Sequence, residues 1–143
     1  MADTEGAFTA EERAAMKDRA QEVRRARRGK ASPEDDLRDL LAKIDELPEP
    51  ERTTALRIHA IVSRTAPELQ PKLWYGMPGW AKGGKNLLFF QSATKFRTRY
   101  ATLGFSDLAR LDDGDLWPNA YAITALTPEV EARIAALVRR ALG

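Results

Sequence analysis

The sequence predicts a single α+β domain in which helices pack on one face of an antiparallel β-sheet. Apolar side chains recur at helical spacing before residue 66 and again after residue 127, whereas strand-like runs are confined to 72–124. Within that stretch, Gly83-Gly84 is a two-residue hairpin signal between two such runs. Strands that are segregated from helices along the chain are typical of α+β folds. We expect the 143 residues to comprise a basic helical extension over 1–31 and an α+β domain over 32–143.

The extension begins with a helix start signal. Thr9 followed by Glu12 is a capping box, and it opens a helix that we expect to continue to about Arg28. Its apolar stripe is thin, so this helix buries little surface and we expect it to dock loosely. A basic cluster at its end is interpreted as a solvated helix terminus that complements the helix dipole. The cluster consists of Arg24, Arg25, Arg27, Arg28 and Lys30.

Two further helices precede the sheet. Ser32 and Pro33 are a cap and first-turn pair that opens the second helix, and Pro50 starts the third, which runs to about Thr65. The stripes that define these helices are Leu37, Leu40, Leu41, Ile44 and Leu47 in the second, and Ala55, Ile58, Ile61, Val62 and Thr65 in the third.

The remaining chain predicts strands, a corner and two helices. The segment Gly76-Met77-Pro78-Gly79 combines two glycines with a proline and predicts a stiff, irregular corner. Ser106 caps a short helix to Leu111, and Thr127-Pro128 opens the final helix. The expected strands are Trp80–Lys82, Asn86–Gln91, Thr98–Leu103 and Tyr121–Thr124, and the second of these is continuously apolar, which favours a central position.

Composition excludes several classes of site. The chain has no cysteine, which excludes disulfides, thiolate catalysis and cysteine-bound metals. Its one histidine, His59, has no Asp or Glu at helical spacing, so we interpret it as structural. The net charge of +2 favours neither a nucleic-acid nor a membrane partner. The N-terminus resembles no signal peptide and no apolar run spans a bilayer, so we expect a cytoplasmic location.

One stretch is basic and aromatic. Residues 71–105 hold six basic side chains and no acidic one, together with most of the aromatic residues. Such residues on a sheet face can hold anions or stack bases, although aromatics at strand spacing are also typical of a core. The candidate ligand-binding residues are Tyr75, Trp80, Lys95, Arg97, Arg99 and Tyr100.

A second candidate site is acidic. Asp35, Asp36 and Asp39 lie in the first turns of the second helix, and hard cations prefer such oxygen ligands. The alternative is a solvated helix face, because carboxylates near a helix N-terminus are favourable without any metal.

The segment Trp74-Tyr75-Gly76-Met77-Pro78 carries a family resemblance. With Lys85–Phe90, Lys95-Phe96 and Tyr100 after it, the chain resembles the YdhG-like family of bacterial domains of unknown function over roughly 34–142. The resemblance implies a small α+β fold similar to frataxin and, by one branch of the family, an iron chaperone. If that role applies, ferrous iron would bind acids such as Asp35, Asp36 and Asp39, or Asp112, Asp113 and Asp115.

Two functions follow as hypotheses. The first is a non-enzymatic protein that binds Fe(II) through exposed carboxylates and passes it to an iron-accepting protein. The second is a module that binds an anionic small molecule, a peptide or single-stranded nucleic acid through the basic aromatic sheet face. No residue pattern identifies a catalytic residue, and the oligomeric state is left open.

Overall fold

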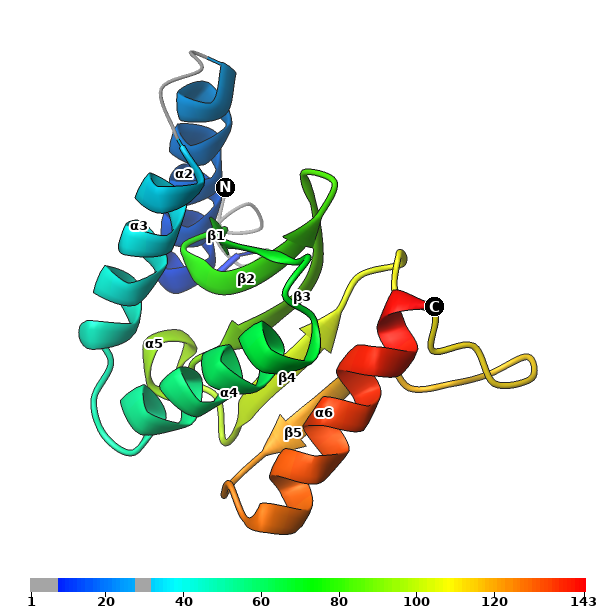
Figure 1. The fold of residues 1–143 in the computed structure, drawn as a ribbon. Coiled ribbons are helices and arrows are strands. Elements are labelled where there is room, and N and C mark those ends of the chain that lie inside the picture. Colours follow the sequence, from blue (N-terminus) through cyan, green and yellow to red (C-terminus); the bar gives the residue numbers. More distant parts are fainter. Residues whose placement is uncertain (1–7, 28–31) are drawn as a thin grey trace.

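Five antiparallel strands form one sheet, and their order across the sheet is their order along the chain. Figure 1 shows this sheet in a computed structural model, which describes residues 8–27 and 32–143. The α+β class predicted from the sequence is confirmed. The strands are β1 (Gln70–Trp74), β2 (Met77–Lys82), β3 (Lys85–Gln91), β4 (Ala101–Phe105) and β5 (Ala120–Ile123).

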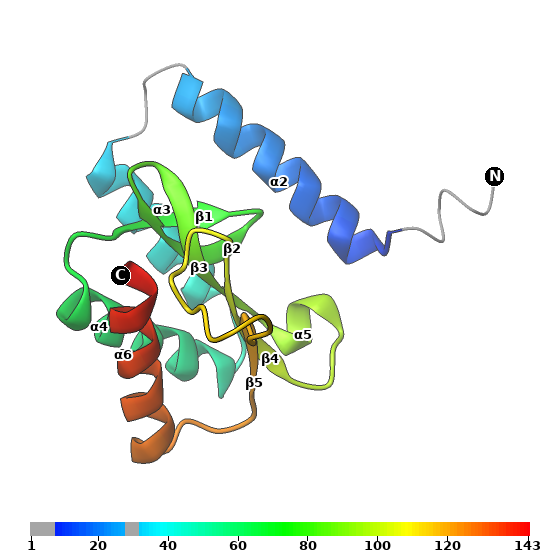
Figure 2. The same cartoon turned by 90° about the vertical axis from the view of Figure 1, so that its right-hand side faces the viewer.

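Helices lie on both sides of this sheet. Figure 2 shows α4 and α6 on one side and α2 on the other. The expectation that helices pack on one face therefore holds for α4 and α6, whereas α2 is an exception. No helix among the described residues is both long and apolar enough to cross a membrane. The helices are α2 (Ala10–Arg27), α3 (Pro33–Asp45), α4 (Glu51–Thr65), α5 (Ala93–Phe96) and α6 (Pro128–Leu142).

The main core lies between α3, α4 and α6 and the sheet. Trp80 of β2 pairs with Leu88 of β3, which pairs with Phe105 of β4, so the three share one sheet face. Burying such large apolar side chains is the dominant favourable term in folding. The largest fully buried side chains are Trp80, Phe90, Leu40, Ile44, Ile58, Ile61, Leu87, Leu88, Leu103, Val62 and Val138.

The predicted helix starts at Thr9, Ser32 and Thr127 are confirmed. Thr9 Oγ1 accepts from the N–H of Glu12, whose carboxylate accepts from the N–H of Thr9. Ser32 caps α3 with Asp35 as its reciprocal partner, and Thr127 caps α6. The end of α2 falls at Arg27, while Arg28 and Lys30 of the basic cluster lie outside the described residues.

Two turns in the sheet use left-handed backbone. Gly83 and Gly84 have φ of +58° and +82°, which confirms the predicted hairpin between β2 and β3. Tyr75 and Gly76, with φ of +55° and +75°, form a second such turn between β1 and β2. The expected irregular corner is therefore a tight hairpin, and Met77 already belongs to β2.

Several expected elements differ from the structure. Strand β1 occupies residues 70–74, where no strand was expected, since the first expected strand was Trp80–Lys82. Strand β4 begins at Ala101, not Thr98, because the short helix α5 and its left-handed C-cap, Arg97, come first. The helix expected from Ser106 is absent, since the Ser106 hydroxyl accepts from the N–H of Leu108 in a local turn.

Candidate functional site

The predicted basic aromatic surface is not a single sheet face. Trp80 is fully buried, and its indole N–H donates to His59 Nδ1 over 3.2 Å, so it cannot face a ligand on an open surface. Arg97, Arg99 and Tyr100 lie in the connection between α5 and β4, outside every strand. The prediction that these residues share one sheet face is therefore wrong.

The exposed arginines have partners of their own. Arg97 forms an ion pair of 3.1 Å with Glu11 of α2. The guanidinium of Arg99 lies 5.1 Å from the ring centre of its neighbour Tyr100, which is cation–π geometry. Arg97 and Arg99 therefore have different partners and do not form one shared cationic site.

The three candidate metal ligands are likewise engaged. The Asp35 carboxylate accepts from the backbone N–H of Ser32 and from Arg38, and these hydrogen bonds lower its pKa. Asp36 is buried and accepts from Gln70 Nε2 over 2.6 Å. Asp39 pairs with Arg25 of α2.

This acidic set does not fit a metal site in its present arrangement. Within 8–27 and 32–143, no three His, Cys, Asp or Glu side chains are grouped so that they could hold an ion. Each of the three aspartates instead accepts a hydrogen bond or ion pair from a different partner. Binding a cation there would require breaking these contacts.

The structure forms a pocket beside the Tyr75-Gly76 turn, which we call the corner pocket. Its volume is about 370 Å³, and it lies between the end of α3, the start of β2 and the short helix α5. Asp18 of α2 completes its wall. The lining residues are Asp18, Lys43, Glu46, Leu47, Pro48, Gly76, Met77, Pro78, Phe90, Ser92, Thr94, Lys95 and Phe96.

Lys95 is the central charged group of the corner pocket. Its ammonium is half-buried and donates to the carbonyl oxygen of Gly76 over 3.3 Å. Burial is the largest cause that lowers the pKa of Lys95, and the nearby cation of Lys43 lowers it further. The carboxylates of Asp18, Glu46 and Glu22 act in the opposite direction.

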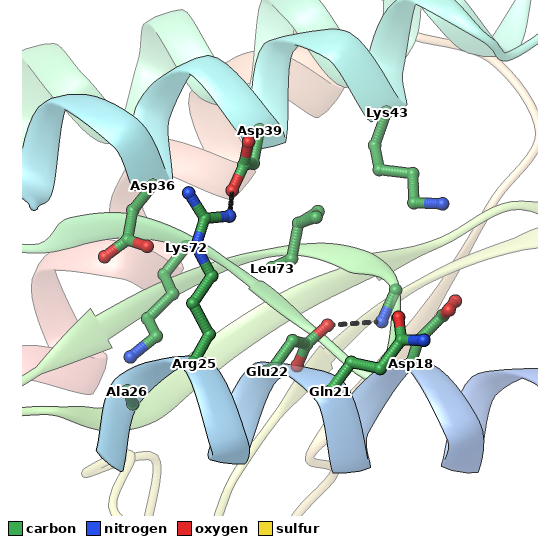
Figure 3. A pocket seen from close by; sticks show the side chains of 11 residues that line it. Asp18, Gln21, Glu22, Arg25, Ala26, Asp36, Asp39, Lys43, Lys72 and Leu73 are labelled. Carbon is green, nitrogen blue, oxygen red and sulfur yellow. Dashed lines mark hydrogen bonds and ion pairs between the residues drawn. The ribbon is translucent and has the colours of Figure 1, made fainter. Parts of the chain in front are cut away.

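A second hollow of about 220 Å³ lies between α2 and α3, and it shares Asp18, Lys43 and Gly76 with the corner pocket. In Figure 3, Arg25 reaches from α2 toward Asp39 on α3, and Glu22 points at the turn that follows β1. The two hollows therefore adjoin along the Gly76 turn.

Sequence reasoning found part of this site. It named Lys95, and it named Tyr75 next to the lining residue Gly76, but it missed Lys43 and Asp18 because these lie on helices far away in the chain. The sequence signal that could have located this pocket was the pair Tyr75-Gly76, since it marks the turn at which α2, α3 and α5 meet.

Compared with models of known families, with curated proteins and with solved structures, the chain has no match. The resemblance to the YdhG-like family therefore stays a prediction, and so do the iron role and the frataxin-like subtype.

Proposed function

We propose that this protein binds a small organic anion with an apolar body in the corner pocket. The observation that carries the proposal is the environment of Lys95, a half-buried ammonium in an apolar-walled pocket next to a second cation, Lys43. Two neighbouring cations in a partly desolvated site favour an anionic ligand, because its charge offsets their repulsion.

The charges on the protein leave room for such a ligand. Among the described residues, no carboxylate lies within ion-pair distance of Lys95, and Lys43 has only a 4.0 Å contact with Glu46. Asp18 and Glu46 nevertheless line the pocket. We therefore expect the anionic group of the ligand to lie at Lys43 and Lys95. We expect the rest of the ligand to carry few polar groups.

The walls favour an apolar body on the ligand. Met77, Pro78 and Phe90 line one part of the pocket, and Leu47 and Phe96 line others. A volume of about 370 Å³ is at the lower end of the range of ligand pockets, which suits a single ring rather than a nucleotide.

Phenylacetate is a suitable probe, with neutral 2-phenylacetamide and cationic phenethylamine as shape-matched controls. Chemical-shift titration of the ¹⁵N-labelled protein is expected to show saturable binding of phenylacetate, centred on Gly76, Met77 and Lys95. Lys95→Met is expected to weaken binding about tenfold, because one charge-assisted contact is removed. Lys85→Met is the matched control, since Lys85 is an exposed lysine at the hairpin of β2 and β3.

Equal binding of phenylacetate and 2-phenylacetamide would contradict the charge requirement. Equal effects of Lys95→Met and Lys85→Met would contradict the assignment of the site.

The iron-delivery role stays a prediction from the family resemblance. No arrangement among the described residues favours it over anion binding, because Asp35, Asp36 and Asp39 have separate partners. Anaerobic titration with ferrous iron, with magnesium as the control, tests it directly. Iron-selective binding that is lost in the Asp35/Asp36/Asp39→Ala variant would support the original assignment.

A further inference from the structure

Glu22 of α2 fills a carboxylate site made by the backbone. Its two carboxylate oxygens accept from the N–H of Tyr75 over 3.1 Å and from the N–H of Gly76 over 2.9 Å. Successive N–H groups in a turn form a concavity that binds anions. The pair of donors lies in the turn between β1 and β2, whereas the acceptor is supplied by a separate helix.

Little apolar surface holds that helix in place. Ala15 is the one buried apolar side chain among the described residues of α2, and Met16 is 39% exposed. Val23 is half-buried beside Trp74. The other specific contacts are charged: Arg25 pairs with Asp39, Glu11 with Arg97, and the Arg19 guanidinium lies 5.7 Å from the ring centre of Tyr75. Exposed ion pairs of this kind contribute little stability and are screened by salt.

The surface beneath α2 offers groups that α2 does not use. The Nδ2 of Asn86 is buried and has no hydrogen-bond partner within the described parts of the chain. It lines a hollow of about 310 Å³ with Trp74 and Lys72 on one side and α2 on the other. Lys72 has no carboxylate within ion-pair distance among the described residues, although it faces two hollows beside α2.

The side chains of α2 leave part of this surface without a charge partner, although Arg25 pairs with Asp39 and Glu11 with Arg97. Over 10–27 the helix carries four acidic and six basic side chains. The surface beneath it offers two backbone donors, the orphan amide of Asn86 and the cation of Lys72. A more acidic segment would satisfy more of these groups.

We propose that this surface is a binding site for an acidic helical peptide of a partner, and that α2 is its displaceable internal occupant. We call the surface the α2 seat and define it by Lys72, Trp74, Tyr75, Gly76 and Asn86. A carboxylate of the peptide takes the position of Glu22 on the N–H pair. The proposal does not depend on the organic anion of the corner pocket, because the α2 seat uses different donors.

Competition between α2 and the peptide sets the apparent affinity. Five residues, 28–32, connect α2 to α3 in the sequence, so α2 competes at an effective concentration in the millimolar range. A peptide in solution therefore binds the wild-type protein weakly. A substitution at Glu22 weakens the competitor without altering the α2 seat.

The test uses a fluorescein-labelled peptide with the sequence of residues 8–27 that carries Lys17→Glu and Arg24→Glu, two exposed positions, so that its side-chain charge changes from +2 to −2. Binding is measured by fluorescence anisotropy with the full-length protein at low salt. Glu22→Gln in the protein is expected to tighten binding about tenfold or more, because its own helix loses a charge-assisted pair of hydrogen bonds. Glu22→Gln in the peptide is expected to weaken binding by a similar factor. Glu12→Gln in the protein is the matched control, since among the residues that the structure describes Glu12 bonds only within its own helix start.

A covalent cross-link between α2 and α3 provides a second test that can be used if a variant folds poorly. The chain has no cysteine, so Arg25→Cys/Asp39→Cys can be joined selectively by a short bismaleimide that fixes α2 to α3. The locked protein is expected to lose peptide binding. Binding that survives the lock, or that responds equally to Glu12→Gln and Glu22→Gln, would overturn the proposal and leave that of the corner pocket unaffected.

Discussion

The indole N–H of Trp80 donates to Nδ1 of His59 over 3.2 Å, and the two ring planes are inclined by 23° with centroids 6.3 Å apart. An imidazole nitrogen that accepts a hydrogen bond carries no proton, so this contact requires neutral His59. Burial lowers the pKa of His59 below its ordinary value of 6.5. The pair thus links helix α4 to the centre of the sheet in a way that depends on pH.

The first prediction concerns that dependence. Because the folded protein holds His59 at a lower pKa than the unfolded chain, the unfolded chain takes up the proton first as the pH falls. The contribution of neutral His59 to the free energy of unfolding is expected to be complete above pH 6.5. It is expected to be lost as the pH falls from 6.5 toward the lowered pKa of His59 in the folded state. Urea unfolding at a series of pH values from about 7.5 to about 5.5 measures this slope.

His59→Phe provides the control for that prediction. It keeps a ring against Trp80 but leaves the buried indole N–H without its acceptor, which is expected to cost about 1–3 kcal/mol at neutral pH. As His59 is the chain's one histidine, the variant is expected to show a flat profile over this window. A slope that persists in the variant would show that another group is responsible.

Lys95 gives a second prediction. Burial and the charge of Lys43 lower its pKa from 10.5, so Lys43→Met is expected to raise the pKa of Lys95 and Asp18→Asn to lower it further. Titration of ¹³C-methylated lysines by NMR reports this value residue by residue. Lys82→Met, an exposed lysine outside the corner pocket, is expected to leave the Lys95 titration unchanged.

Glu51 gives a third prediction, on stability. Its carboxylate accepts from the Ser92 hydroxyl and from the N–H of Ala93, both over 2.6 Å, and so joins the first turn of α4 to the start of α5. Glu51→Ala is expected to reduce the free energy of unfolding by about 2–3 kcal/mol, since partly buried donors lose a charged acceptor.

Denaturant unfolding checks this value, with Glu68→Ala as the matched control. The side chain of Glu68 is exposed and accepts no hydrogen bond within 8–27 and 32–143, so we expect a change within about 0.5 kcal/mol. Equal losses in both variants would argue against the capping role of Glu51.

A fourth prediction concerns close packing on the second face of the sheet. The ring of Phe89 lies over Gly104 of the neighbouring strand, and a Cβ at position 104 would stand 2.6 Å from Phe89 Cε1. Gly104→Ala is therefore expected to destabilise the protein by about 1–3 kcal/mol. In a Phe89→Ala background the same substitution is expected to cost much less, and a double-mutant cycle measures the difference. Additive effects would rule out the clash as the cause.

The sequence was most informative where structure depends on local signals. The starts of α2, α3 and α6 follow from Thr9, Ser32 and Thr127, each of which caps its own helix through near neighbours. The Gly83-Gly84 hairpin is equally local, because both positions need left-handed backbone.

It was least informative where distant segments decide the outcome. Strand β1 contains Pro71 and Lys72 and has no continuous apolar run, so only its pairing with β2 makes it a strand. The corner pocket likewise exists because α2, α3 and α5 meet at Gly76. Periodicity along the chain contains no information on such a meeting point.

The position of β1 at the end of the sheet has a consequence for assembly. An end strand has one neighbour, and its unpaired backbone groups can recruit a strand from another molecule. Here Pro71 removes one donor, all five residues of β1 are half-buried, and α2 and α3 lie beside the strand (Figure 3). Displacing α2 would uncover part of this protection. A partner that replaces α2 therefore also has to cover β1, because an uncovered β1 could pair with a strand of a second molecule.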